Sequence, residues 1–132
     1  MIYWDTSAII TLLAQGRLGE IKGVTRPHAL AEFYSRTTGK GFMVSGRIIK
    51  LTPELAHARV KDLAAQLSFV ELTAQETTAA LAEGVKLGIQ GGRTHDLLHA
   101  AAARKARATT IYTYNLADFA GLTRIPSQAP PG

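Results

Sequence analysis

At 132 residues and 46% apolar composition, the chain can form one hydrophobic core and is too apolar for a disordered protein. It contains no cysteine, which excludes disulfides and thiolate metal sites and is compatible with a reducing cytoplasm. No apolar stretch approaches the ~20 residues needed to span a bilayer, and we expect no signal peptide. The net charge of +5 favours polyanions such as nucleic acid as partners.

Predicted strands and helices alternate along the chain. Ile2-Tyr3-Trp4 is an apolar run too short for anything but a strand, and a helix over residues 6–14 follows it. Thr52-Pro53 starts a helix that runs to about residue 67, and Thr73 with Glu76 has the spacing of a capping box for a helix over 73–88. The remaining predicted helices cover 27–39, 94–106 (capped by Thr94) and 115–120, and the remaining strands cover 22–25, 69–72, 109–113 and 123–125.

This alternation predicts one domain over residues 1–126, with a parallel sheet covered by helices on both faces. Residues 43–51 show no clear period, and the Pro-rich residues 127–132 are expected to form a flexible tail. In open sheets of this kind, ligands bind beyond the carboxyl ends of the strands. Asp5, directly after the first strand, is therefore a candidate site residue.

Other oxygen-bearing side chains occupy positions that could meet Asp5. Asp96 opens a predicted helix, Asn115 and Asp118 follow the strand over residues 109–113, and Glu32 lies on the second helix. A cluster of hard oxygen ligands without cysteine suits Mg²⁺ or Mn²⁺ rather than zinc. Such an ion acidifies a water molecule and screens a phosphate, which phosphodiester hydrolysis requires.

Each candidate also has a purely structural explanation. Asp5 can cap the first helix, and Asp96 suits the first turn of its own helix, where the dipole favours an acid. Asn115 can act as a helix cap, and Glu32 can pair with Arg36 one turn on. The joint placement of these side chains, rather than any one of them, favours a metal site.

Other catalytic patterns are missing from the sequence. His95 and His99 flank Asp96 and His28 lies on the second helix, but no pair has the His-Glu-x-x-His spacing of a zinc hydrolase. We expect His99 to be a partly buried helix residue. Ser7 lacks a Gly-x-Ser-x-Gly context, and there is no Gly-x-x-x-x-Gly-Lys loop, so neither a serine hydrolase nor ATP use is supported.

Four stretches carry a resemblance that covers nearly the whole chain: residues 5–8, 29–33, 96–103 and 113–119. In their order and spacing they resemble a PIN domain, and are most similar to the small VapC-type toxins of bacterial toxin–antitoxin pairs. The resemblance implies a three-layer α/β/α fold with a central parallel sheet. It also implies a Mg²⁺- or Mn²⁺-dependent endoribonuclease that leaves 3′-hydroxyl and 5′-phosphate ends, a homodimer, and a cognate antitoxin that blocks the site.

The resemblance further implies roles for individual residues. The metal would be held by Asp5, Glu32, Asp96 and an acid of the last stretch. The family often has aspartate where this chain has Asn115, so either the Asn115 carbonyl or the carboxylate of Asp118 could complete the site. Positions that orient the carboxylates or their waters are matched by Thr6, Ser7 and Thr113.

Arg26, Arg36 and Arg93 are close in sequence to the acids and are candidates for holding RNA. An alternative is a PIN-like module that binds RNA or a protein without cleavage, with Asn115 marking a decayed site. A phospho-acceptor receiver domain is disfavoured, because no acidic pair stands near the first strand and no acceptor aspartate follows the second clear one. The RNA target is not encoded in any local motif.

Overall fold

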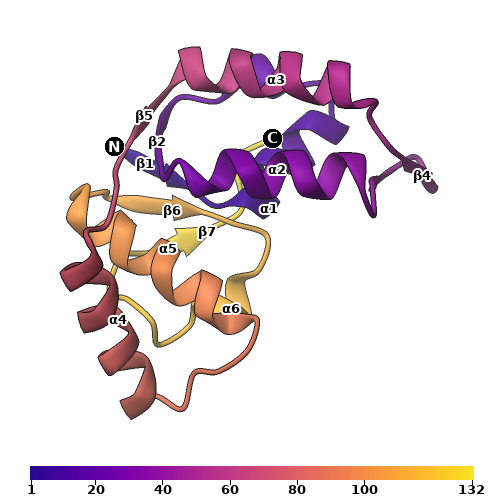
Figure 1. Cartoon of the computed structure of the whole chain (residues 1–132). Coiled ribbons are helices and arrows are strands. Elements are labelled where there is room, and N and C mark those ends of the chain that lie inside the picture. Colours follow the sequence, from indigo (N-terminus) through magenta and orange to yellow (C-terminus); the bar gives the residue numbers. More distant parts are fainter.

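A computed structural model describes all residues from 1 to 132 as three layers, with a parallel sheet between two groups of helices (Figure 1). The strands are β1 (Ile2–Trp4), β2 (Gly23–Thr25), β3 (Phe42–Val44), β4 (Arg47–Ile49), β5 (Leu67–Phe69), β6 (Thr110–Tyr112) and β7 (Ser127–Gln128). The helices are α1 (Thr6–Ala14), the 3₁₀ turn η1 (Leu18–Glu20), α2 (His28–Thr38), α3 (Pro53–Gln66), α4 (Ala74–Lys86), α5 (Arg93–Lys105) and α6 (Leu116–Phe119). The predicted fold class is confirmed.

The sheet has the strand order β5-β2-β1-β6-β7, and all of its pairings are parallel. From β1 the chain builds outward through β2 to β5, then returns to the other side of β1 to form β6 and β7. The topological switch point therefore lies between β1 and β6, where ligand sites of open α/β sheets are found. The register pairs Trp4 with Tyr112, so the residues that follow, Asp5 and Thr113, leave the sheet side by side.

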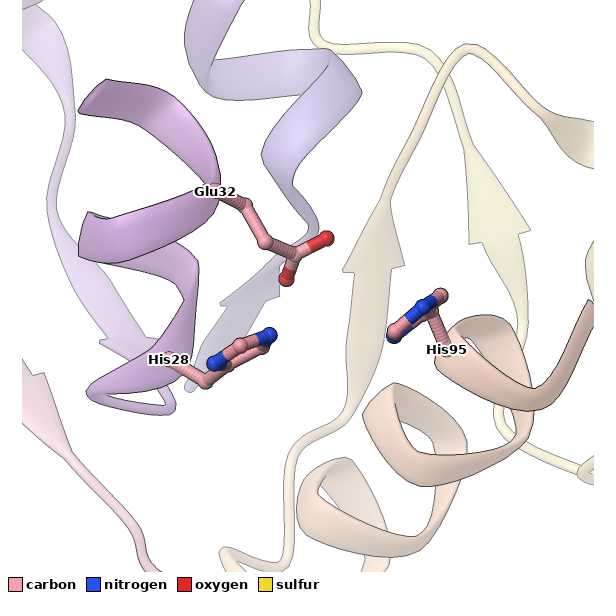
Figure 2. Close-up of side chains that lie close together, drawn as sticks. All are labelled: His28, Glu32 and His95. Carbon is pink, nitrogen blue, oxygen red and sulfur yellow. The ribbon is translucent and has the colours of Figure 1, made fainter. Parts of the chain in front are cut away.

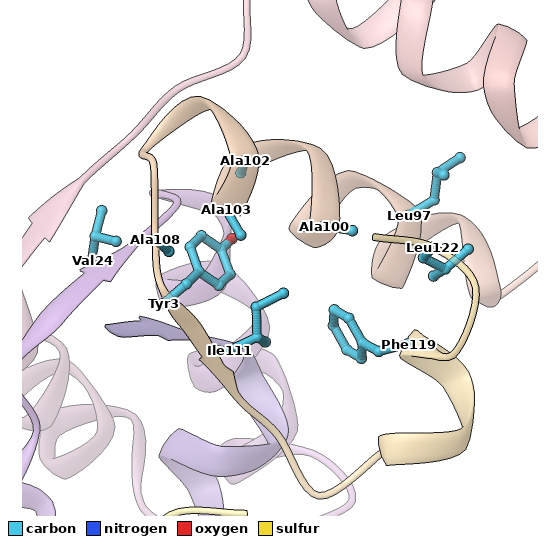
Figure 3. Packing of buried hydrophobic residues seen from close by; sticks show 10 residues of the cluster. All are labelled: Tyr3, Val24, Leu97, Ala100, Ala102, Ala103, Ala108, Ile111, Phe119 and Leu122. Carbon is cyan, nitrogen blue, oxygen red and sulfur yellow. The ribbon is translucent and has the colours of Figure 1, made fainter. Parts of the chain in front are cut away.

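Alternating side chains of β1 supply both halves of the core. Tyr3 packs against α5, in a cluster with Ile111 and the small residues of that helix (Figure 3). Trp4 faces the opposite side, in a second cluster with residues of α1, α2 and α3. This two-residue period is that of a strand buried on both faces. Because the two residues before Asp5 are anchored in the core on opposite faces of the sheet, the end of β1 from which Asp5 projects is fixed.

The predicted helix starts at Thr52 and Thr73 are confirmed. The Thr52 hydroxyl accepts from the Leu55 N–H at 3.2 Å, and Thr73 and Glu76 form the complete capping box. The prediction that Thr94 caps α5 was wrong. Gly92 occupies the N-cap position, and Thr94 lies inside the first turn of the helix, where its N–H donates to the Gly91 carbonyl. No helix in the structure is long and apolar enough to cross a membrane.

Two further predictions about elements are corrected by the structure, and one stretch for which no element was predicted is assigned. The strand expected at 69–72 is β5, two residues earlier, because Leu67 is drawn into the core while pairing with β2. Residues 123–125 form a turn, in which the Thr123 hydroxyl accepts from the Ile125 N–H, and not a strand. Residues 43–51, which show no clear period in the sequence, belong to an antiparallel hairpin of β3 and β4. This hairpin is separate from the main sheet.

The tail expected over residues 127–132 begins instead with an edge strand. Ile111 of β6 donates its N–H to the Pro126 carbonyl at 2.9 Å, and Thr113, directly after β6, donates to the Gln128 carbonyl at 3.0 Å. The Arg17 guanidinium donates to the Pro131 carbonyl at 2.7 Å. These contacts use backbone atoms of the last segment, so they leave no pattern of apolar side chains in the sequence.

Candidate metal and nucleic-acid site

A cleft of about 650 Å³ opens at the carboxyl end of β1, between α2 and the start of α5. Only two of its fifteen lining residues are hydrophobic. The predicted site residues on its wall are Asp5, Thr6, Ser7, Glu32, Arg36, Asp96 and Asn115. Side chains from four separate stretches of the sequence therefore meet where the strand order predicts a ligand site.

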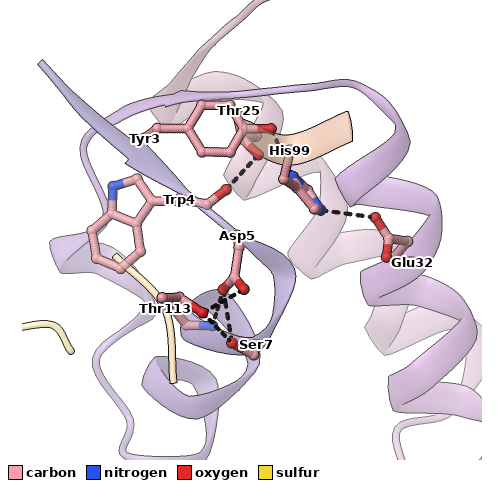
Figure 4. A network of polar contacts seen from close by, with 9 residues as sticks. Tyr3, Trp4, Asp5, Ser7, Thr25, Glu32, His99 and Thr113 are labelled. Carbon is pink, nitrogen blue, oxygen red and sulfur yellow. Dashed lines mark hydrogen bonds and ion pairs between the residues drawn. The ribbon is translucent and has the colours of Figure 1, made fainter. Parts of the chain in front are cut away.

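Asp5 is the most constrained side chain of the cleft, and it is only 2% exposed. One carboxylate oxygen, Oδ1, accepts from the Ser7 hydroxyl at 2.7 Å and from the Ala8 N–H at 3.0 Å, so Asp5 also caps α1. The other, Oδ2, accepts from the Thr113 hydroxyl at 2.7 Å (Figure 4). A carboxylate offers about four acceptor positions, so roughly one remains for a ligand.

Thr113 and Ser7 connect Asp5 to the chain that follows β6. Thr113 accepts from the Asn115 N–H at 2.9 Å, and Ser7 accepts from the Tyr114 N–H at 3.1 Å. The loop that carries Asn115 is thus fixed by the same hydroxyls that orient Asp5. Thr113 does not line the cleft itself, and its place behind Asp5 is that of a positioning residue.

Asp96 lies in the first turn of α5, where a carboxylate is favoured by the helix dipole. Burial nevertheless raises the pKa of Asp96 above its usual value, and the negative charges of Asp118 and Asp5 raise it further. Burial and the two neighbouring carboxylates thus both disfavour the charged form of Asp96, and a bound cation would favour that form.

Glu32 is held from behind by a buried chain of polar groups. Its Oε1 lies 3.3 Å from Nε2 of His99, whose Nδ1 is 2.7 Å from the Tyr3 hydroxyl (Figure 4). Burial raises the pKa of Tyr3, so its phenol keeps its proton, and the short contact to Nδ1 fixes the His99 ring beside Glu32. Burial alone would also raise the pKa of Glu32, but the neighbouring His99 and His28 hold it below its usual value.

His99 is thus a buried helix residue, 2% exposed, with a positioning contact to Glu32. Sequence reasoning missed other members of the cleft: His28, His95 and Lys40. The spacing of four residues between His28 and Glu32 already places both on one face of α2 and could have flagged the first of them. The position of His95 depends on how α5 packs, which no local pattern reveals.

Asn115 and Asp118 differ in where the structure puts them. Asn115 lines the cleft, and its side chain makes no capping hydrogen bond to α6. Asp118, one turn later, is not part of the cleft wall and acts on Asp96 only through its charge. Of the two residues, only Asn115 lies on the cleft wall.

The three candidate arginines differ in whether they line the cleft. Arg36 lines the cleft, and Lys40 lies beside it on the same wall. Arg93 is outside the wall and donates to the Asp118 carbonyl at 3.1 Å. Arg26 is only 9% exposed and does not reach the cleft, so its expected contact with RNA is disfavoured because its guanidinium is enclosed by the fold.

No protein-family model and no curated protein matches this chain. Among solved structures, it resembles a chain of VapBC-1 from nontypeable Haemophilus influenzae, with a TM-score of 0.65 and 20% identity over 98% of both chains. It also resembles a chain of VapBC2 from Rickettsia felis bound to a promoter DNA fragment, with a TM-score of 0.66 and 18% identity over 99% of this chain and 100% of that one.

The chain has the PIN-like fold of these VapBC chains. The likeness covers 98–99% of this chain and 98–100% of the two solved chains. The PIN-like architecture expected from the four sequence stretches is therefore confirmed at the level of the fold.

Proposed function

We propose that the protein is a Mg²⁺- or Mn²⁺-dependent endoribonuclease, and the toxin of a toxin–antitoxin pair. The observation that carries this proposal is the meeting of Asp5, Glu32, Asp96 and Asn115 in one polar cleft at the switch point of the sheet. The PIN-like fold shared with VapBC chains supports it.

The residues present fit a divalent cation. Thr6 Oγ1 is buried on the cleft wall without a hydrogen-bond partner, whereas buried polar atoms of this kind usually have one. The proposed ligands are the oxygens of Asp5, Glu32 and Asp96, with the Asn115 carbonyl as a fourth. When bound, the cation supplies the positive charge that acidifies a water molecule and stabilises the charge on the phosphate.

The chain's own residues provide the remaining tasks. Ser7 and Thr113 hold the Asp5 carboxylate in one orientation before any ligand arrives. On the facing wall, Arg36 and Lys40 place positive charge within the same cleft, where it can bind a phosphate of the RNA backbone. The net charge of +5 adds a general attraction for nucleic acid.

The proposed partners are a cognate antitoxin and a second copy of this chain. Both solved relatives are VapBC structures, and the one from Rickettsia felis is bound to DNA from the promoter. Exposed apolar side chains are available for such contacts: Met43, Ile48, Leu81 and Val85 are each more than 40% exposed. A ribonuclease toxin of this kind would act on cellular RNA in the cytoplasm.

The test is cleavage of RNA by the purified protein, with and without Mg²⁺ and with EDTA. We expect cleavage that requires the metal and is lost in Asp96→Asn, because the substitution removes a proposed ligand charge. Asp62→Asn is the matched control, since Asp62 is an exposed acid of α3 paired with Arg59. Cleavage that persists in EDTA would contradict the mechanism, and RNA binding without cleavage under any metal would favour the non-catalytic module.

A further inference from the structure

The outer part of the cleft holds a second group of possible metal ligands, which differs in chemistry from the carboxylates. His28 and Glu32 project from one face of α2, and His95 comes from the first turn of α5. One ligand atom from each of the three lies within 4.8 Å of the others. Figure 2 shows the Glu32 carboxylate and both imidazole rings facing a common space.

The geometry is close to that of a bound ion. In a tetrahedral site with bonds of about 2.0–2.1 Å, the ligand atoms lie about 3.4 Å apart. The two imidazoles are exposed, and their rings lie nearly parallel, with centroids 6.2 Å apart and an interplanar angle of 14°. Neither ring makes a hydrogen bond or ion pair to the rest of the protein, so a small rotation of each can close the site.

The donor set selects the class of metal. Two imidazole nitrogens and one carboxylate suit Zn²⁺, Co²⁺ or Ni²⁺, whereas Mg²⁺ prefers oxygen ligands. Three protein ligands leave a fourth position open to water. Glu32 has the outer support that metal ligands commonly have, because His99 lies 3.3 Å behind it and is itself fixed by Tyr3.

We propose that His28, Glu32 and His95 form a binding site for a borderline transition-metal ion, and that Zn²⁺ is the principal ion bound there. Glu32 also belongs to the carboxylate set of the proposed nuclease site. An ion on the histidines therefore competes with Mg²⁺ or Mn²⁺ for Glu32, and zinc regulates the nuclease. This regulatory consequence rests on the proposed function, whereas the zinc site does not.

The site is tested by titrating the metal-free, untagged protein with Co²⁺, followed by absorption spectroscopy, and with Zn²⁺, followed by calorimetry. We expect one ion per chain with the visible absorption of nitrogen-ligated Co²⁺. His28→Ala and His95→Ala should each weaken Zn²⁺ binding by about tenfold or more, while His57→Ala, an exposed histidine of α3, should leave it unchanged. Equal Zn²⁺ affinity in the wild type and both cleft variants would overturn the site.

Competition is tested separately by electron paramagnetic resonance of Mn²⁺. Zn²⁺ should release bound Mn²⁺ from the wild type, and His28→Ala should need about tenfold more Zn²⁺ for the same release. If the wild type binds Zn²⁺ through the histidines but binds no Mn²⁺, the nuclease proposal fails and the zinc site stands. If Mn²⁺ binds and Zn²⁺ never displaces it, the regulatory consequence is wrong.

Discussion

The two sides of the cleft are built in opposite ways. On the β1 side, the carboxylate of Asp5 is buried and accepts three hydrogen bonds from Ser7, Ala8 and Thr113. On the outer side, formed by α2 and the start of α5, His28 and His95 are exposed and have no such partners. The first side is fixed before a ligand binds, so it suits a reaction that needs one geometry. The second can adjust, so it suits an ion that comes and goes.

The largest expected effect follows from changing the fixed side. Asp5→Asn removes a charge but keeps an oxygen that can accept from the Ala8 N–H, and asparagine is as good a helix cap as aspartate. We expect Mg²⁺-dependent cleavage to fall by at least about 100-fold, since charge stabilisation by a metal contributes several kcal/mol. The melting temperature should change little.

The cleavage rate is measured as the initial rate at saturating Mg²⁺, and the melting temperature is measured by thermal unfolding of each variant. Asp62→Asn removes the same charge from an exposed position on α3 and should match the wild type in both. An Asp5→Asn variant that cleaves RNA normally would remove Asp5 from the mechanism.

An intermediate effect is expected from Thr113→Val, which keeps the volume of the side chain but removes the hydroxyl that orients Asp5. Leaving Asp5 Oδ2 unpaired should cost about 1–3 kcal/mol of stability. Loss of a group that positions a metal ligand typically lowers metal affinity or activity by about 10–100-fold. Calorimetry with Mn²⁺ and denaturant unfolding measure the two effects.

Thr37→Val is the matched control for that experiment. Thr37 is also fully buried, but its hydroxyl donates to the Phe33 carbonyl within α2 rather than to a cleft residue. The Thr37→Val substitution should reduce the free energy of unfolding without changing the affinity for Mn²⁺. Equal losses of affinity in both valine variants would show that general destabilisation, and not the orientation of Asp5, is responsible.

A smaller effect is expected for RNA binding. Arg36→Ala, made in the inactive Asp5→Asn protein, should weaken RNA binding several-fold. The plot of the logarithm of the RNA-binding constant against the logarithm of salt concentration should become less steep by about one, as expected for loss of one phosphate contact. Arg47→Ala is the control, because Arg47 is exposed on β4 and is not part of the cleft. If both variants lose the same affinity, the attraction comes from overall charge and not from the cleft.

The smallest expected effect is a change in pH dependence. Burial and the charges of Asp118 and Asp5 raise the pKa of Asp96, so Asp96 keeps its proton to a higher pH than an ordinary aspartate. Asp118→Asn removes one of these charges, which lowers the pKa of Asp96. The acid limb of the Mn²⁺-affinity profile should therefore move to lower pH, and an unchanged profile would argue against this coupling.

The difference between the two sides also explains how far the sequence could be read. Asp5, Asp96 and Asn115 follow strands or open helices, and the parallel sheet gathers such positions at one edge, so their meeting was predictable. The pairing of His28 with His95 depends on how α2 and α5 pack across the cleft, and no local period encodes it. The strand β7 escaped detection for a related reason, because its backbone and not its side chains makes the contacts with β6.

The most direct test of the account is the anomalous scattering of a crystal grown with Mn²⁺ at a pH where the carboxylates are ionised. The account predicts a single strong peak, at coordination distance of about 2.0–2.3 Å, touching oxygens of Asp5, Glu32 and Asp96. A peak bound elsewhere, or carboxylates that turn away from one another with no ion between them, would contradict the proposed nuclease site.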